Sequence, residues 1–265
     1  MHLPRQLVLA ALMVTTLAGC ATPPPKTDIA ATQAFRDEND PLQPMNRDLY
    51  GFNDRLDAYV AKPITHTYVN ITNQWFRSHA SNFTSNIGTL REAIYFMASG
   101  KPRDAGTALV RFVVNSTVGI GGIFDPATGL GYHKIDTDLG LVLAGYGVGE
   151  GPYLFIPVTG PTTLRDGTAS IASLFVTPIP YGPTGTAGTI FRYSVTALGG
   201  VNTRAKLDPT IDDIKATSLD PYAAFRSLYR QSRASQLARI DACDTPTVPD
   251  WFPQQKQEQN QSCSQ

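Results

Sequence analysis

The stretch that decides the fold is NRDLYGFNDRLDAYVAK, residues 46–62. Apolar residues recur in it at helical spacing, and most charged residues fall between them. The apolar positions are Leu49, Phe52, Leu56, Tyr59 and Val60. The pattern predicts an amphipathic helix that Asn46 caps and that ends at Pro63, because proline disfavours a helical residue before it. Its apolar face packs against a core or lies in a membrane interface.

A second amphipathic helix is predicted near the C-terminus, at DPYAAFRSLYRQSRASQLARI, residues 220–240. One face carries Tyr222, Phe225, Leu228 and Tyr229, and the arginines at 226, 230, 233 and 239 lie mostly off it. These arginines could meet lipid headgroups or acidic protein, or the helix could be a plain surface helix.

Charge nearly vanishes in the middle of the chain. Residues 138–203 carry five charged side chains, whereas the chain average of 17% predicts about 11. Residues 167–191 are all uncharged, but Pro178, Pro180 and Pro183 argue against one straight span. Short apolar helices that meet at Gly/Pro-rich bends, in a body within one membrane leaflet, fit this pattern.

A shorter uncharged run, residues 112–124, is too short and too rich in glycine to span a bilayer as a helix. It predicts a hairpin or re-entrant membrane segment, and the alternative is a buried loop in a soluble core. The residues of this segment are Val118, Gly119, Ile120, Gly121, Gly122, Ile123 and Phe124.

The N-terminus has the features of a secretory signal, with Arg5 before an apolar run and LAGC at residues 17–20. LAGC resembles a bacterial lipobox, in which Cys20 is acylated and the chain is cut before it. This predicts a signal peptide at 1–19, an acylated Cys20 with a proline-rich tether at 20–39, a body at 40–240 and a polar, disordered tail at 241–265. The tail cysteines, Cys243 and Cys263, either form a disulfide in an oxidising periplasm or remain free thiols.

Several function classes find no support in the sequence. Basic and acidic residues balance at 22 each, so nothing indicates nucleic acid as a partner. No nucleophile elbow, zinc-protease motif or P-loop is present, and the four histidines are scattered. We therefore expect no enzyme activity, no metal and no cofactor.

Six motifs in register resemble the MlaA/VacJ lipoprotein family. They are DPLQPMNRDLYGFNDRLDAYVAKP (40–63), SNFTSNIG (81–88), GKPRDAG to FDPA (100–127), YGVGEGPYLFIPVTGPTTLRDG (146–167), NTRAKLD (202–208) and DPYAAFRSLYRQ (220–231). Two departures stand out: Met45 replaces a usual aromatic, and residues 179–189 are unusually rich in Pro and Gly.

The resemblance implies a mainly α, ring-shaped bundle of short amphipathic helices in the inner leaflet of a Gram-negative outer membrane. Its implied function is to remove mislocalised phospholipid from the outer leaflet through a central amphipathic channel and to pass it to a periplasmic, MlaC-like carrier, which maintains lipid asymmetry. Its implied partners are phospholipids, a porin trimer and that carrier. The alternative is a structural lipoprotein that scaffolds a porin or envelope complex without moving lipid.

The resemblance also assigns a role to a glycine-rich segment. Its residues, together with one arginine, are Gly145, Tyr146, Gly147, Gly149, Gly151 and Arg204. Alternating glycines leave an extended backbone unobstructed or weaken a helix, which suits a channel wall that passes acyl chains. A cation such as Arg204 could hold a phosphate headgroup. Without the family context, the glycines predict a packed turn, and Arg204 a surface side chain.

Overall fold

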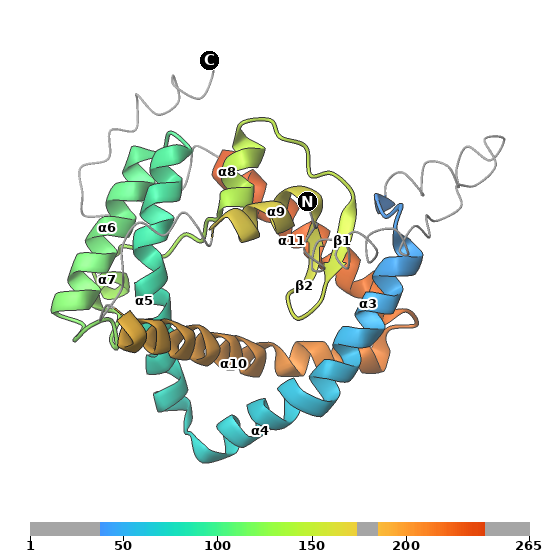
Figure 1. Cartoon of the computed structure of the whole chain (residues 1–265). Helices are drawn as coiled ribbons and strands as arrows, with labels where there is room; N and C mark the ends of the chain where they lie inside the picture. The colour runs from blue at the N-terminus through green and yellow to red at the C-terminus, as the bar shows by residue number, and fades with distance from the viewer. Residues whose placement is uncertain (1–37, 174–184, 242–265) are drawn as a thin grey trace, which may run out of the picture.

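The computed structural model describes residues 38–173 and 185–241. The predicted signal peptide, most of the tether, Cys20 and the pair Cys243 and Cys263 lie outside these residues. In Figure 1 the described elements follow one another around a ring-like circuit, with α5 and α6 on one side and α3 on the other.

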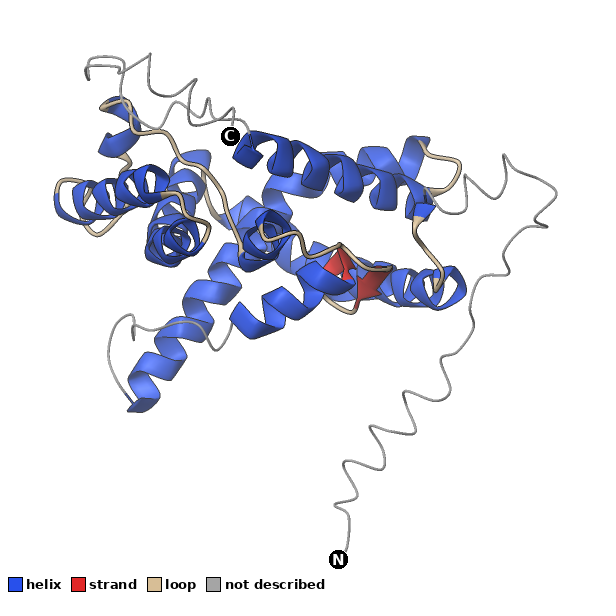
Figure 2. Ribbon diagram, turned by 90° about the horizontal axis from the view of Figure 1, so that it is seen from above, coloured by secondary structure: helices blue, strands red, loops and turns tan. Residues whose placement is uncertain are grey.

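The predicted mainly α class is confirmed, because helices make up most of the described chain. The helices are α3 (Gln43–Leu56), the π-helix η1 (Asp57–Ala61), α4 (Lys62–Ile71), α5 (Gln74–Ala98), α6 (Pro102–Thr117), α7 (Pro126–Gly129), α8 (Leu139–Gly145), α9 (Leu164–Ser173), α10 (Gly185–Thr217) and α11 (Pro221–Asp241). A two-stranded antiparallel sheet, β1 (Tyr153–Ile156) and β2 (Gly160–Thr163), lies among them (Figure 2).

The first predicted helix exists, but both of its predicted ends are wrong. It begins at Gln43, with Pro44 in its first turn, so Asn46 is not its cap. Nor does the helical run stop at Pro63, since η1 and α4 carry it on to Ile71. Proline lacks the N–H that an α-helix would donate four residues back, and the π-helix shifts the hydrogen-bond register directly before this position.

Asn46 instead joins α3 to β1. Its side-chain amide donates to the Tyr153 carbonyl (3.1 Å) and to an Asp40 carboxylate oxygen (2.7 Å), and its oxygen accepts from the Phe155 N–H (2.9 Å). Asn53 follows Asn46 by seven residues and therefore lies on the same helix face. Its side-chain amide donates to the Ile156 carbonyl, and its oxygen accepts from the Val158 N–H. The two asparagines therefore bond the edge of β1 and the turn that follows it.

Two small apolar cores lie on opposite sides of the circuit. One joins α5 to α6 through Ala93, Phe96, Ala105 and Ala108. The other packs Tyr153, Phe155 and Tyr222 against α3, with the rings of Tyr50 and Phe155 in edge-to-face contact at 5.6 Å. Neither core is large enough to hold the whole circuit together.

The two C-terminal helices join elements that are far apart in sequence. The Asn202 side chain on α10 donates to the Arg77 carbonyl and accepts from the Tyr68 hydroxyl, which attaches α10 to α5 and α4. The helix predicted at 220–240 is confirmed as α11. Two features were not predicted from the sequence: the β1–β2 hairpin, and the length of α10, a helix of 33 residues that contains Pro209.

We expect Asn46→Ala to lower the free energy of unfolding by about 3 kcal/mol, because the Phe155 N–H and the Tyr153 carbonyl would be buried without a partner. Chemical denaturation of the purified protein in a mild detergent measures this. Asn53→Ala is the matched control: its site is only half-buried, so water can replace the amide and the loss should be about 1 kcal/mol or less. Equal losses at the two positions would contradict the assigned role of Asn46.

Candidate functional site

The glycine-rich segment begins with a helix stop. At the end of α8 the Val148 N–H donates to the Leu143 carbonyl (3.0 Å) and the Gly147 N–H donates to the Ala144 carbonyl (2.8 Å). Gly147 has a left-handed backbone (φ +81°). These are the two bonds of a Schellman motif, in which glycine takes the left-handed position. The segment is thus neither the extended strand nor the flexible helix that the sequence analysis considered.

The remainder of the segment is tied to its neighbours. The Glu150 carbonyl accepts from the Arg165 N–H, and its carboxylate accepts from the Asn39 amide. At the other end, the Tyr146 hydroxyl donates to the Ala98 carbonyl at the end of α5. The space around Gly147 and Gly149 is open, so these glycines do not fill a packed turn.

Arg204 lies between two carboxylates. Its guanidinium pairs with Asp57 of η1 (2.7 Å) and with Asp208 of α10 (2.6 Å). Lys215 also contacts Asp57. Burial alone would raise the pKa of Asp57, but the hydrogen bonds from Arg204 and Lys215 hold it below its usual value. The positive charge of Arg204 is therefore already compensated within the chain.

Arg226 of α11 is buried rather than directed at solvent. Arg226 pairs with Asp40 (2.7 Å) and Glu38 (3.2 Å). These contacts join α11 to the chain before α3. The acidic partner that the sequence analysis considered for α11 is thus, for Arg226, supplied by this chain itself.

Arg233 joins α11 to two further helices. It contacts the Asp138 carboxylate (2.6 Å) and the Asp166 carboxylate (2.8 Å). Asp138 also accepts from the Leu141 N–H at the start of α8. A methyl group at Gly140 would come within 2.4 Å of Asp166, so only glycine lets α8 approach this pair.

Residues 118–124 form a tight turn after α6, and the hairpin or re-entrant membrane segment expected here stays a prediction. Ile120, Gly121 and Gly122 all have a left-handed backbone. A methyl group at Gly119 would come within 2.4 Å of the Asn115 carbonyl, which explains the glycine there. The apolar side chains of this turn are exposed: Val118, Ile120, Ile123 and Phe124.

Exposed aromatic residues gather beside this turn. Trp75 stacks on His79 (ring centroids 4.1 Å apart), and His79 contacts Phe124 edge-on (4.8 Å). With Ile71 and Phe76, these residues form what we call the aromatic corner, at the junction of α4 and α5. Trp75 is 61% exposed and Ile71 is 77% exposed. A soluble protein rarely leaves such a patch uncovered.

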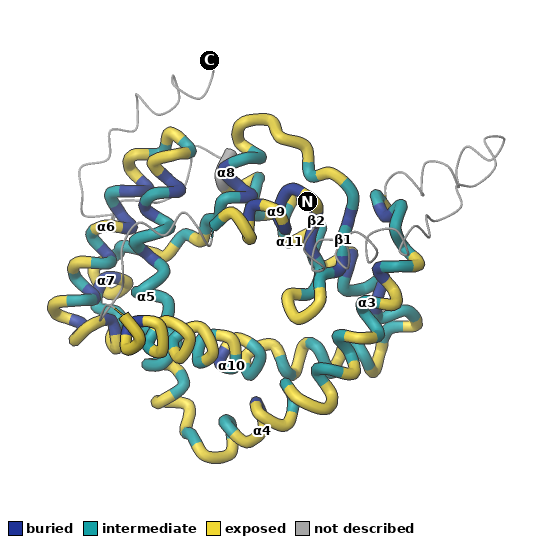
Figure 3. Tube along the Cα trace, in the orientation of Figure 1, coloured by how far each residue is buried: buried dark blue, intermediate teal, exposed yellow. Residues whose placement is uncertain are grey.

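The aromatic corner is part of a wider inversion of polarity. Exposed positions run along α4, α10 and the connection from α8 to β1 (Figure 3). Many large apolar residues are among them, whereas buried polar and charged residues outnumber buried apolar ones in the described parts of the chain. In neither described range does a helix combine the length and hydropathy needed to cross a membrane.

A polar cavity of about 260 Å³ lies between α5, α6 and α10. Every side chain that lines it is polar or charged, and three are cations: Arg111, Lys134 and Lys206. Asp125 is its only carboxylate among the described lining residues, and it pairs with Arg111 (3.0 Å). This site could not be found from the sequence, because its residues come from five separate segments: α5, α6, the turn before α7, the loop before α8 and α10.

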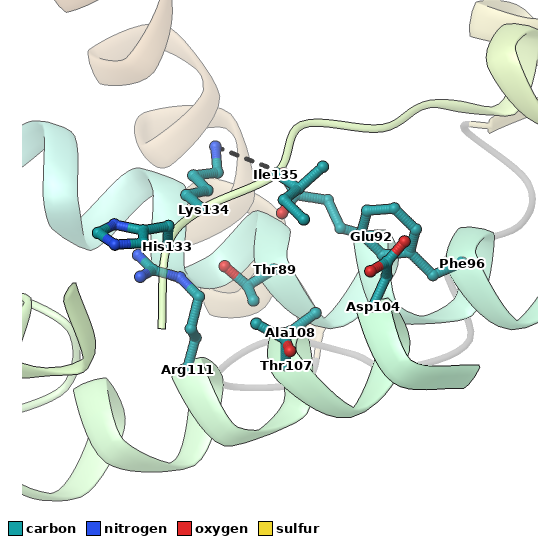
Figure 4. A pocket seen from close by; sticks show the side chains of 10 residues that line it. All are labelled: Thr89, Glu92, Phe96, Asp104, Thr107, Ala108, Arg111, His133, Lys134 and Ile135. Atoms are coloured by element: carbon teal, nitrogen blue, oxygen red, sulfur yellow. Dashed lines mark ion pairs between the residues drawn. The ribbon is translucent and has the colours of Figure 1, made fainter. Parts of the chain in front are cut away.

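A much smaller pocket of about 10 Å³ adjoins the polar cavity and shares Thr89, Arg111 and Lys134 with it. Figure 4 shows Lys134 reaching from the loop before α8 toward Glu92 of α5, at 3.5 Å. Burial raises the pKa of Glu92, and Lys134 opposes that shift. Lys134 also contacts Asp136 (2.6 Å), so its charge is shared between two carboxylates.

The family described as MlaA lipoprotein matches residues 38–236. The chain belongs to the MlaA lipoprotein family. The resemblance inferred from the six motifs is thereby confirmed. A Rickettsia conorii protein, RC0123, is 35% identical over 198 residues, which cover 74% of this chain and 77% of that protein.

Two further relatives of this MlaA-family chain carry descriptive names. The Escherichia coli "Intermembrane phospholipid transport system lipoprotein MlaA" is 32% identical over 233 residues, 85% of this chain and 86% of that protein. A solved structure described as "Structural basis for maintenance of bacterial outer membrane lipid asymmetry" superposes with a TM-score of 0.63 at 28% identity. That match covers 75% of this chain and 98% of the other.

The two exposed glycines of the segment should respond differently to alanine. Gly147→Ala should lower the free energy of unfolding by about 1–2 kcal/mol, because a side chain is strained at its left-handed backbone. Gly149 has a negative φ and open space around it, so Gly149→Ala should be neutral or stabilise by about 0.4–1 kcal/mol. Thermal unfolding in detergent measures both, and the reverse order would rule out the Schellman stop.

Lowering the pH should weaken the contacts that Asp166 makes with Arg165, Tyr229 and Arg233. Burial would raise the pKa of Asp166, but hydrogen bonds from Arg233, Arg165 and Tyr229 hold it well below its usual value. The stabilisation is present above the unfolded pKa, about 3.9, and is lost as pH falls below it toward the folded pKa. Asp166→Asn should therefore reduce stability at pH 7 and flatten its fall below about pH 4. Exposed Asp48→Asn is the control, and an unchanged acid profile in Asp166→Asn would refute the prediction.

Proposed function

We propose that this chain is a lipoprotein of the Gram-negative outer membrane that removes mislocalised phospholipid from the outer leaflet and passes it to a soluble periplasmic carrier. The observation that carries this proposal is the match to the MlaA lipoprotein family over residues 38–236. The similarity to the Escherichia coli phospholipid transport lipoprotein supports it. Transport makes or breaks no bond in the lipid, so the function is not enzymatic.

The inverted polarity supports a position within a bilayer. Exposed apolar side chains at the aromatic corner and in the 118–124 turn suit contact with acyl chains. Buried ion pairs and side-chain amides satisfy the polar groups inside, as a low-dielectric setting demands. An acylated Cys20 and the proline-rich tether would attach the body to the periplasmic leaflet.

The proposed path for lipid is a central amphipathic channel with the segment Gly145–Gly151 in its wall. Tyr146 is exposed there, and no side chain obstructs Gly147 or Gly149. If Arg204 binds a headgroup, the phosphate competes with Asp57 and Asp208, because both carboxylates now hold the guanidinium. A porin trimer and an MlaC-like carrier are the proposed partners.

Deletion of the gene tests the function directly. We expect phospholipid to accumulate in the outer leaflet, where an outer-leaflet-specific lipid acyltransferase or phospholipase reports it, and sensitivity to detergent and chelator to rise. Wild-type protein restores the barrier, while Cys20→Ala, which cannot be acylated, fails to restore it.

Immunoblots of membrane fractions must accompany this test, so that a lost function is separated from lost protein. An unchanged outer-leaflet composition after deletion, with porin association lost, would favour the structural alternative. An unmodified Cys20 in the mature wild-type protein would end the lipoprotein assignment, and mass spectrometry of the N-terminus decides this.

A further inference from the structure

We propose that the turn between β1 and β2 contacts an acyl chain of the phospholipid that the protein moves, and that Val158 is the side chain that makes this contact. This inference rests on the proposed function and deepens it, because it names a residue on the path of the lipid. Val158 is not among the residues that the resemblance to the family assigns to the channel.

Val158 combines two features that are each unfavourable in water. Its backbone is left-handed (φ +70°), and it is 81% exposed. A left-handed backbone brings the Cβ atom close to the following carbonyl oxygen, and a β-branched residue tolerates this least. At the other left-handed positions of the described ranges the chain has glycine or Asn39, except for Ile120, which is also exposed. Glycine or asparagine would close a turn in water at a lower cost, so the valine has another purpose.

The turn is held in its strained form from outside. Ile156 pairs with Gly160, so three residues, 157–159, close the hairpin. A proline followed by a left-handed residue is the pattern of a type II turn, in which the second of the two is usually Gly or Asn. The Asn53 side chain accepts from the Val158 N–H (2.7 Å) and donates to the Ile156 carbonyl (2.9 Å). Both sides of the turn are therefore fixed to α3, which presents the valine rigidly.

The surroundings of the turn suit an acyl chain. The hairpin packs against α3, α9 and α11, and its turn points into the interior of the circuit (Figure 1). All three residues of the turn are exposed (Figure 3). The sequence carries no charged residue from Gly151 to Leu164, so a headgroup would find no ionic partner in this hairpin. An acyl chain that passes the turn removes the valine from water, which is favourable.

The left-handed backbone permits an unusually clean test, because the valine can be deleted without damage to the fold. Glycine adopts this backbone without strain, so Val158→Gly should keep the protein at its normal level. Its melting temperature in a maltoside detergent should stay the same or rise, by up to about 2–4 °C. We expect the same variant, expressed from the chromosome, to raise outer-leaflet phospholipid severalfold above wild type.

A second variant keeps the strain and removes only the apolar character. Val158→Thr retains a β-branched side chain but replaces one methyl group with a hydroxyl. It should raise outer-leaflet phospholipid with no gain in melting temperature. Val113→Thr is the matched control, because Val113 is an exposed valine (56%) in α6, and this variant should behave as wild type.

Photochemical crosslinking detects the contact directly. The crosslinking amino acid benzoylphenylalanine is encoded in place of Val158, and cells that make the full-length protein are irradiated. We expect mass spectrometry of the purified protein to find a phospholipid adduct. The same amino acid in place of Asp213, an exposed residue of α10 outside the hairpin, is the control and should give no such adduct.

The outcomes separate the claims. A fall in melting temperature in Val158→Gly overturns the argument from strain, and an adduct with protein instead of phospholipid overturns the contact. A phospholipid adduct beside a Val158→Gly variant with normal outer-leaflet phospholipid shows contact with bilayer lipid only, and also overturns the proposal. If phospholipid is captured at position 158 but deletion of the gene leaves the outer leaflet unchanged, the contact stands and the proposed function fails.

Discussion

Ion pairs between segments distant in sequence are the interaction on which this structure depends. Arg204 joins α10 to η1, Arg226 joins α11 to the start of the body, and Arg233 joins α11 to α8 and α9. Burying charges costs most of what their attraction gains, so such pairs specify which segments meet more than they add net stability. Loss of one carboxylate would leave each of these arginines a second one, whereas loss of Arg226 would leave the buried Asp40 without its cation, at a cost of about 3–5 kcal/mol.

The dependence on polar contacts follows from where the apolar side chains are. Two small clusters form the only apolar cores described, and large residues such as Ile71, Trp75 and Val158 are exposed. In a bilayer the hydrophobic effect does not drive helices together, because lipid chains are as apolar as leucine. Hydrogen bonds such as those of Asn46 and Asn53 to β1 then determine how the elements assemble.

Several elements of the fold could be predicted from the sequence, and the elements that could not be predicted have physical reasons. Helical periodicity revealed α3 and α11, and the motifs identified the family. The ends of α3 could not be predicted, because a π-helix directly before Pro63 lets the helical run continue and because Asn46 bonds a distant strand rather than capping its own helix. The β1–β2 hairpin had a readable signal, the run Tyr-Leu-Phe-Ile between Pro152 and Pro157, but the surrounding glycines and prolines obscured it.

The candidate sites, too, could be predicted from the sequence only in part. The sequence indicated that residues 145–151 and Arg204 matter, yet it could not tell that Gly147 stops a helix or that Asp57 and Asp208 already hold Arg204. The polar cavity left no pattern at all, since Asn86, Arg111, Lys134 and Lys206 meet only through the packing of α5, α6 and α10. Local patterns reveal elements, but not which side chains those elements bring together.

The central claim, that the exposed apolar surface faces acyl chains, can be measured at one residue. The chain has two tryptophans, so Trp251→Phe leaves Trp75 of the aromatic corner as the only fluorophore of its kind. The protein is reconstituted in vesicles whose lipids carry bromine on their acyl chains. The account predicts strong quenching of Trp75 by these lipids and little quenching by aqueous acrylamide. The claim would be contradicted if acrylamide quenched the fluorescence of Trp75 and the brominated lipids did not.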